Sequence, residues 1–191
     1  MLENNYMIGY ICAGVVLLII LIVVMVCFYN KMIKLRNLVN EAYATMDVYL
    51  KKRADIIPNM VAAARGYAKH EKEIFANADK AISAWSGEER NRSTRFLREN
   101  ELDTTVSSMK ALCERYPQIN ASENFLALQN ELHDVEKDIA NARKYYNGVV
   151  NSYNSTMQTF PANIAAFLLG FRKEQLFVAS VLERESVSIS F

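Results

Sequence analysis

The sequence contains few of the residues that make turns. Its 191 residues include only six glycines and three prolines. A β-sandwich or a β-barrel needs frequent turns, and these turns are rich in glycine and proline. The composition therefore argues against both architectures.

The sequence has only three cysteines. Cys12 and Cys27 lie in an apolar stretch and Cys113 lies in a helical pattern, so the spacing predicts neither a disulfide framework nor a zinc site.

The net charge of the chain is small. The formal net charge is +1, whereas a nucleic-acid-binding protein is expected to show a strong basic excess. We therefore expect no nucleic-acid partner. Because 51% of the residues are apolar, we expect ordered protein with room for one modest domain.

A short N-terminal segment, residues 1–6, precedes a long apolar run. Residues 7–29 include no charged residue. As a helix they would extend about 34 Å, slightly more than the ~30 Å hydrocarbon core of a bilayer. We therefore predict a transmembrane helix with lipid as its partner. A cleaved signal peptide fits less well, because the N-terminal segment carries Glu3 instead of a basic region and has no A-x-A cleavage site. A lipid-modified Cys27 also fits less well, because residues 24–26 lack the small residue usual just before such a cysteine.

Positive charges follow this apolar run closely, at Lys31, Lys34 and Arg36. The positive-inside rule therefore predicts that the N-terminus lies outside and the rest of the chain lies in the cytoplasm. Gly9 and Ala13 form a small-xxx-small pair, which favours the packing of two such helices against each other. A second copy of the chain is thus one expected partner.

The soluble part opens with a heptad pattern. Apolar residues recur in steps of four and three over residues 35–74, with interruptions at Arg53 and His70. We interpret this as a very long helix that continues from the membrane. Pro58 is expected to kink or divide it, because proline lacks a backbone donor. The polar residues 86–95 are predicted to connect it to the next helix.

Two further helices are predicted. Residues 102–116 keep the heptad steps until Pro117, and residues 125–153 keep them until the Phe160-Pro161 pair. Asn120 or Ser122 is expected to cap the last helix. Such stripes need partners, so we predict an all-α fold: a long antiparallel bundle of three or four helices over residues 30–161. Residues 162–191 are predicted to be an apolar and basic tail with a short helix or extended segments.

Several single residues invite an interaction or a hinge role. Arg53 on the apolar seam has two interpretations: a buried ion pair with Asp47 or Asp55 that fixes helix register, or an arginine that snorkels to water, which we prefer. Gly148 lies among tyrosines and asparagines, and we prefer close packing inside the bundle over a partner contact there. The candidate interaction or hinge positions are Pro58, Arg53, His70, Tyr146, Gly148 and Tyr153.

Motifs of catalysis are not visible in the sequence. His70 and His133 lie beside carboxylates, which is the composition of a di-iron bundle, but neither follows the Glu-x-x-His or His-Glu-x-x-His pattern. Glycine-rich phosphate loops and nucleophile elbows are also lacking. We therefore predict no catalytic, cofactor-binding or metal site, and no enzyme.

Three longer motifs resemble the LemA family: residues 46–53 (MDVYLKKR), 55–60 (DIIPNM) and 140–147 (ANARKYYN). The resemblance extends over nearly the whole chain. It implies an N-terminal anchor, a long antiparallel helical bundle and a bacterial origin, and one branch of the family is similar to proteins that form magnetosome membranes. It implies no established activity, cofactor or ligand site, so no functional residue is carried over.

Together these patterns predict a non-enzymatic interaction or scaffold protein in the bacterial cell membrane. It would self-associate or bind a membrane or cytoplasmic protein, and could help to organise the envelope. The alternative is a transmembrane sensor or signalling adaptor with its hinge at Pro58, and a third hypothesis is a di-metal enzyme.

Overall fold

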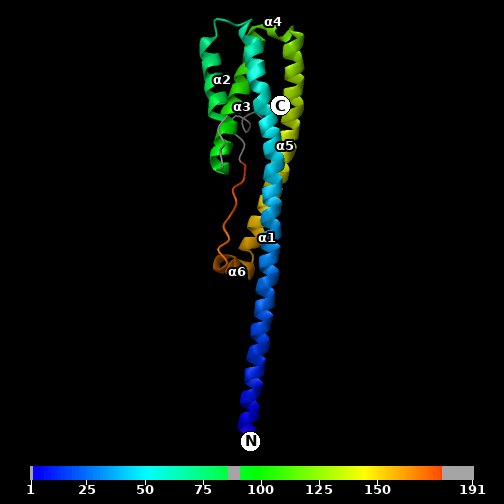
Figure 1. The fold of residues 1–191 in the computed structure, drawn as a ribbon, viewed down its shortest axis with the longest axis vertical. Helices are drawn as coiled ribbons and strands as arrows, with labels where there is room; N and C mark the ends of the chain where they lie inside the picture. Colours follow the sequence, from blue (N-terminus) through cyan, green and yellow to red (C-terminus); the bar gives the residue numbers. More distant parts are fainter. Residues whose placement is uncertain (1, 86–90, 178–191) are drawn as a thin grey trace, which may run out of the picture. The chain divides into compact units, whose positions relative to one another are not determined.

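A computed structural model describes residues 2–85 and 91–177 of the chain. These residues form the helices α1 (Leu2–Arg65), α2 (Lys72–Trp85), α3 (Arg92–Arg115), α4 (Pro117–Asn120), α5 (Glu123–Gln158) and α6 (Ala162–Leu168) (Figure 1). The described residues include no β-strand. The all-α prediction is confirmed. Of the tail predicted for residues 162–191, the structure describes residues 162–177, which include the short helix α6. The rest of that tail lies outside the described residues.

The chain divides into two compact units. We call them the anchor unit, Met1–Glu41 with Gly148–Glu174, and the bundle unit, Ala42–Asn147 with Gln175–Phe191. Helices α1 and α5 contribute residues to both units.

The bundle unit is an antiparallel four-helix arrangement. In Figure 1, α1 and α3 run upward while α2 and α5 run downward. The heptad positions predicted for α3 and α5 supply much of its core, because a helix buries one stripe of its surface. The buried side chains include Met46, Leu50, Ile57, Leu102, Val106, Met109, Phe125, Leu132, Val135, Ile139 and Tyr146. The predicted bundle of three or four helices is therefore confirmed.

The first predicted helix ends earlier than its apolar pattern suggested. Helix α1 passes Pro58 without a break, so proline does not divide it. The helix ends before Gly66, a residue of low helix propensity, and the amides of Tyr67 and Ala68 then both donate to the carbonyl of Ala64, at 3.0 and 3.2 Å. His70 lies exposed in this connection, so its predicted place on the helix seam is wrong.

Helix α3 begins inside the segment that was predicted to be a connection. The side chain of Asn91 accepts a hydrogen bond from the amide of Ser93 at 2.9 Å and so caps the helix. Residues 86–90 of that predicted connection lie outside the described part. The predicted end before Pro117 is confirmed, and Ser122 directly precedes α5, with its carbonyl accepting the amide of Leu126 at 2.9 Å.

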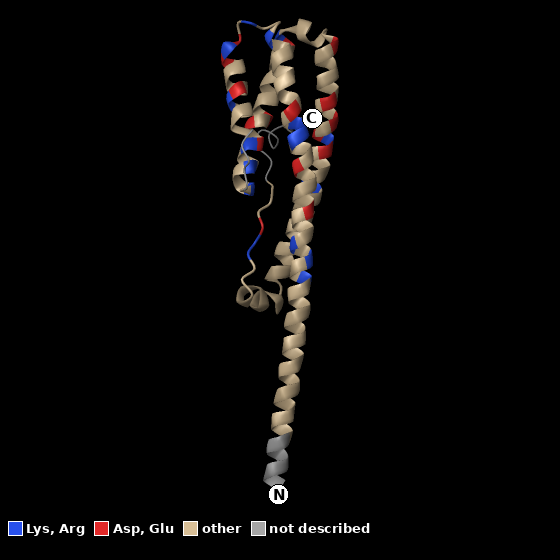
Figure 2. Cartoon of the chain, in the orientation of Figure 1, with Lys and Arg blue, Asp and Glu red and all other residues tan. Residues whose placement is uncertain are grey.

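In the anchor unit, the N-terminal part of α1 has no protein cover. Every side chain of residues 9–24 is exposed, and this part carries no Lys, Arg, Asp or Glu (Figure 2). Among the described residues, α1 is the one helix that is long and apolar enough to cross a membrane. The predicted membrane helix is thus present as a helix of suitable length and composition.

Candidate functional site: a buried charge cluster and a tail clamp

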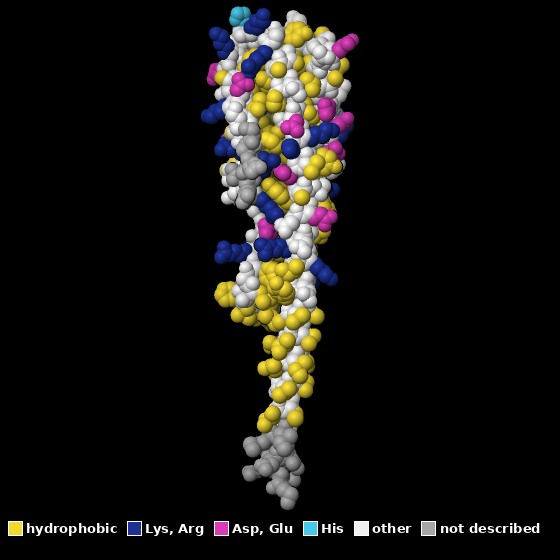
Figure 3. Space-filling view, viewed as in Figure 1, with side chains coloured by type: hydrophobic (Ala, Val, Ile, Leu, Met, Phe, Trp, Pro, Cys, Tyr) yellow, Lys and Arg dark blue, Asp and Glu magenta, His cyan; other side chains and the backbone are white. Residues whose placement is uncertain are grey.

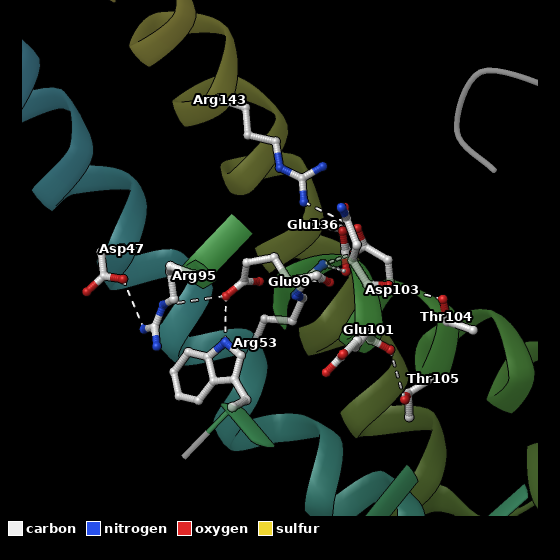
Figure 4. Close-up of polar contacts among 12 residues, drawn as sticks. Asp47, Arg53, Arg95, Glu99, Glu101, Asp103, Thr104, Thr105, Glu136 and Arg143 are labelled. Carbon is white, nitrogen blue, oxygen red and sulfur yellow. Dashed lines mark hydrogen bonds and ion pairs between the residues drawn. The ribbon is translucent and has the colours of Figure 1, made fainter. Parts of the chain in front are cut away.

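Arg53 lies at the centre of a charge cluster inside the bundle unit (Figure 4). Its side chain comes from α1 and has no exposed surface. The guanidinium group forms ion pairs with Glu99 and Asp103 of α3, and with Glu136 of α5 at 3.3 Å. One buried cation therefore joins α1 to two other helices.

Glu99 is the fully buried acidic member of the cluster. One of its carboxylate oxygens pairs with Arg53, and the other accepts a hydrogen bond from the indole N–H of Trp85 on α2 at 2.5 Å. Arg95, four residues before Glu99 on α3, lies 3.8 Å from the same carboxylate and 3.0 Å from Asp47 of α1. Glu99 thus connects side chains from α1, α2 and α3.

The cluster continues toward α5. Arg143 of α5 lies 3.6 Å from the second carboxylate oxygen of Asp103. Its guanidinium carbon also lies 4.4 Å from the ring centre of Phe177, a cation–π contact. The full charge cluster comprises Asp47, Arg53, Arg95, Glu99, Asp103, Glu136 and Arg143.

The environment keeps Arg53 charged. Burial by itself would lower the pKa of Arg53, but the neighbouring Asp103, Glu99 and Glu136 raise that pKa above its ordinary value. Burial raises the pKa of the Glu99 carboxyl, while Arg53 and the hydrogen bond from Trp85 act in the opposite direction. A buried charge of this kind is tolerated only with its partners in place.

These contacts correct the sequence interpretation of Arg53. The side chain does not snorkel to water, because its guanidinium meets carboxylates inside the bundle. A buried ion pair was the alternative, but its predicted partners are wrong: Asp47 pairs with Arg95, and Asp55 is exposed. Glu99 and Asp103 are four residues apart, so they share one face of α3. This spacing was the one feature of the sequence that could have indicated them as partners of a buried arginine.

The chemical capacity of the cluster is structural. Its carboxylates face guanidinium groups, and among the residues that the structure describes no group of three or more His, Cys, Asp and Glu is placed to hold a metal ion. Arginine, with its fixed planar donors, suits an ion pair in which direction matters. The cluster can therefore fix the register of α1 against α3 and α5.

A second site holds the tail of the chain against α5. In the bundle unit, the hydroxyl of Tyr146 donates to the carbonyl of Gln175 at 2.8 Å. The side-chain amide of Asn147 donates to the carbonyl of Phe177 and accepts its amide N–H, both at 2.9 Å. Asn147 thus pairs with the tail backbone as a neighbouring β-strand would.

The anchor unit repeats this arrangement. Tyr153 donates to the carbonyl of Arg172 at 3.0 Å. Asn154 donates to the carbonyl of Glu174 at 2.9 Å and accepts its N–H at 3.0 Å. Burial raises the pKa of the Tyr153 hydroxyl, so this group stays a donor at neutral pH. We call these two Tyr-Asn pairs and their partners the tail clamp.

The repeat has a simple geometric basis. The two Tyr-Asn pairs are seven residues apart on α5, and their partners are three residues apart in the tail. Seven helical residues rise about 10.5 Å, and three extended residues cover about 10 Å. An extended chain can therefore meet the same motif once in each heptad. Tyr146 and Tyr153 were among the interaction positions predicted from the sequence, but the asparagines that follow them were not.

The other selected residues lie apart from these contacts. Gly148 is exposed, and a Cβ atom added there would meet nothing within 4 Å, so the preferred interpretation of close packing is wrong. Pro58 is half-buried within α1. Roles for Gly148, Pro58 and His70 in partner binding or hinge motion stay predictions.

Known proteins support the resemblance seen in the motifs. The LemA family model matches residues 42–191. The chain is 24% identical over 161 residues to Protein LemA of Metamycoplasma hominis, which covers 84% of this chain and 74% of that protein. It is 29% identical over 72 residues to the magnetosome proteins MamQ 1 and MamQ 2 of Paramagnetospirillum magneticum, covering 38% of this chain but 26% of each of them. The family match includes the residues of both the charge cluster and the tail clamp, and the chain belongs to the LemA family.

Proposed function

We propose that this protein is a non-enzymatic scaffold anchored in the bacterial cell membrane, with residues 7–29 in the lipid and the bundle unit in the cytoplasm. The observation that carries the proposal is the exposure of every side chain in residues 9–24 of α1. Apolar surface in water costs about 25 cal/mol per Å². A bilayer removes that cost, and a helix satisfies its own backbone hydrogen bonds within it.

The charges next to the apolar run support the orientation. Lys31, Lys34 and Arg36 follow it within the anchor unit, and cytoplasmic flanks are enriched in such residues. In intact cells, a membrane-impermeant thiol reagent is expected to miss an engineered cysteine at Asn37, which is exposed, in a background without the native cysteines. Labelling of that cysteine without prior lysis would reverse the proposed orientation.

A scaffold must also bind something, and a second copy of the chain is the partner we propose first. Gly9 and Ala13 of the apolar run allow two membrane helices to pack closely, and the bundle unit exposes single apolar side chains at Val48, Leu97 and Leu126. The MamQ relatives are named magnetosome proteins, which agrees with a role at a membrane. The expected result is a defined oligomer.

Crosslinking in intact cells, followed by light scattering of the full-length protein in detergent, tests this assembly. The matched variants are Gly9→Leu in the membrane helix and Leu97→Ser on α3. Loss of the oligomer in the first would assign assembly to the anchor, and loss in the second would assign it to the bundle. Monomers throughout, in cells and in detergent, would contradict self-assembly.

The alternative, a transmembrane adaptor, is supported by the position of Arg53. This residue lies on α1, the helix that also carries the apolar run, so a shift of α1 would disturb the ion pairs to α3 and α5. Disulfide crosslinking of two anchors through Cys12, in a Cys27→Ser background, would then change the labelling rate of the buried Cys113. Pro58→Ala should remove this change and Asn59→Ala should not; an unchanged Cys113 rate would contradict the adaptor.

A further inference from the structure

Helix α6 in the anchor unit has its large apolar side chains on the outside. Its buried face consists of two alanines, Ala165 and Ala166. The exposed side chains are Ile164, Phe167, Leu168 and Leu169, with Phe160 shortly before the helix. Phe167 is 85% exposed and Phe160 is 81% exposed. A contiguous group of this kind marks a surface that meets a partner or a membrane.

The turn after α6 places this group near the end of the membrane helix. Gly170 has a φ of +74°, and Phe171 then donates its amide to the carbonyl of Ala166 at 3.0 Å, which is a helix end that favours glycine. The ring of Phe171 lies 6.4 Å from that of Phe28 and 6.0 Å from that of Tyr29, measured between centres. Because the apolar run ends at residue 29, α6 is held at the level where lipid tails would give way to headgroups.

The charges around this level are arranged as at a membrane surface. Figure 3 shows the apolar side chains of α6 gathered beside the apolar part of α1, with Lys and Arg side chains next to them. The basic residues of this region are Lys31, Lys34, Arg36, Arg172 and Lys173. Helix α6 has no basic residue of its own, so these side chains come from α1 and from the segment after α6. Lys and Arg side chains clustered at the cytoplasmic end of a membrane helix attract anionic lipid headgroups.

We propose that α6 and Phe160 insert into the cytoplasmic leaflet of the bilayer that α1 crosses, and that the neighbouring basic side chains bind anionic headgroups. The inference rests on the proposed membrane anchor and adds a second contact with the same bilayer. An interfacial helix lies in the plane of the membrane and buries its apolar face about 5–10 Å deep. A lipid interface therefore accommodates the exposed face of α6 without any change of fold.

Depth-dependent fluorescence quenching tests the insertion in the full-length protein. The protein is placed in nanodiscs of phosphatidylglycerol and phosphatidylcholine that carry bromine on the upper acyl chain, where Phe167→Trp is read, or near the chain end, where Ile19→Trp is read. Phe167→Trp reports on α6, Ile19→Trp on the membrane helix, and Leu97→Trp on an exposed position of α3 in the bundle unit. The native Trp85 is present in every variant, and its signal in the unmodified protein is subtracted.

If α6 inserts into the lipid, bromine should quench most of the Phe167→Trp emission, and the remaining emission should shift to the blue. The emission of Leu97→Trp should be quenched little. If Ile19→Trp is quenched and Phe167→Trp is not, α6 lies outside the lipid or against protein, and the inference is overturned while the anchor stands. If Ile19→Trp is not quenched either, the anchor itself is refuted, and the inference with it. Replacing phosphatidylglycerol by phosphatidylcholine should reduce quenching of Phe167→Trp alone; equal quenching would overturn the headgroup contact.

Discussion

In the bundle unit a complete arginine side chain is buried, while in the anchor unit a phenylalanine is 85% exposed. Both arrangements invert the usual distribution of charged and apolar residues. The bundle unit surrounds Arg53 with carboxylates from two helices. The anchor unit leaves Phe167 and the apolar part of α1 without protein cover.

The two units obtain their stabilising partners from different sources. A buried ion loses several kcal/mol of hydration, which only close counter-charges can offset, and the bundle unit supplies these from its own sequence. Exposed apolar surface needs an apolar neighbour, and the proposed neighbour of the anchor unit is lipid. The bundle unit should therefore respond most to substitutions within the chain, and the anchor unit to a change of surroundings.

Removal of the Arg53 charge should destabilise the bundle unit more than any other single change considered below. Arg53→Met leaves Glu99 buried without its main counter-charge, so the free energy of unfolding of the bundle unit should fall by about 3–5 kcal/mol. Urea unfolding followed by the emission of Trp85, which contacts Glu99, measures the loss. Arg98→Met is the matched control, since its ion pair with Glu101 is partly exposed to solvent and is expected to be worth roughly 1 kcal/mol or less.

A double substitution tests whether Arg53 and Glu99 stabilise the bundle unit as a pair. Arg53→Met with Glu99→Leu removes both charges, so the combined loss should be clearly smaller than the sum of the two single losses. Simple additivity would show that the two side chains act independently. The cluster would then not fix the register of α1.

The tail clamp provides a smaller effect that occurs once in each unit. Asn154→Ala removes both hydrogen bonds to Glu174 in the anchor unit, and Asn147→Ala removes both bonds to Phe177 in the bundle unit. Each change should cost about 1–3 kcal/mol of local stability, because backbone groups lose their partners. Hydrogen exchange should show faster exchange at the amides of Glu174 and Phe177, respectively.

Asn151→Ala is the matched control for the clamp, because this exposed residue lies on the same helix between the two asparagines. It should leave both amides as protected as before. If Asn154→Ala and Asn147→Ala also leave them protected, the side-chain bonds are not what holds the tail in place.

The sequence predicted those features that depend on neighbouring residues. The heptad stripe of α5 was recognised because each apolar residue lies three or four positions from the next, and the buried Leu132, Ile139 and Tyr146 confirm it. The same rule failed beyond Arg65, because it joined the steps across the turn at Gly66 and placed exposed His70 on a seam. An apolar period alone does not show where a helix ends.

Features that depend on distant residues were harder to predict. The partners of Arg53 lie 46, 50 and 83 residues away, so its ion pairs follow from the packing of three helices and not from its neighbours. The tail clamp had a local signal, the repeated Tyr-Asn pair at heptad spacing. The Tyr-Asn pairs can bind the tail only where the tail is extended, and the short polar stretch after α6 did not predict that conformation.

Substitutions at two glycines should change the unfolding free energy least, and in opposite directions. Gly148→Ala should raise the unfolding free energy by up to about 1 kcal/mol, because alanine favours the helix and its Cβ meets nothing within 4 Å. Gly170→Ala should lower it by about 1 kcal/mol, because residue 170 has a φ of +74°. Thermal unfolding by circular dichroism measures both. If Gly148→Ala is stabilised but no longer crosslinks in cells, a partner binds that face of α5. If Gly148→Ala is destabilised, the added methyl group is not in open space, and the expectation for this glycine is wrong.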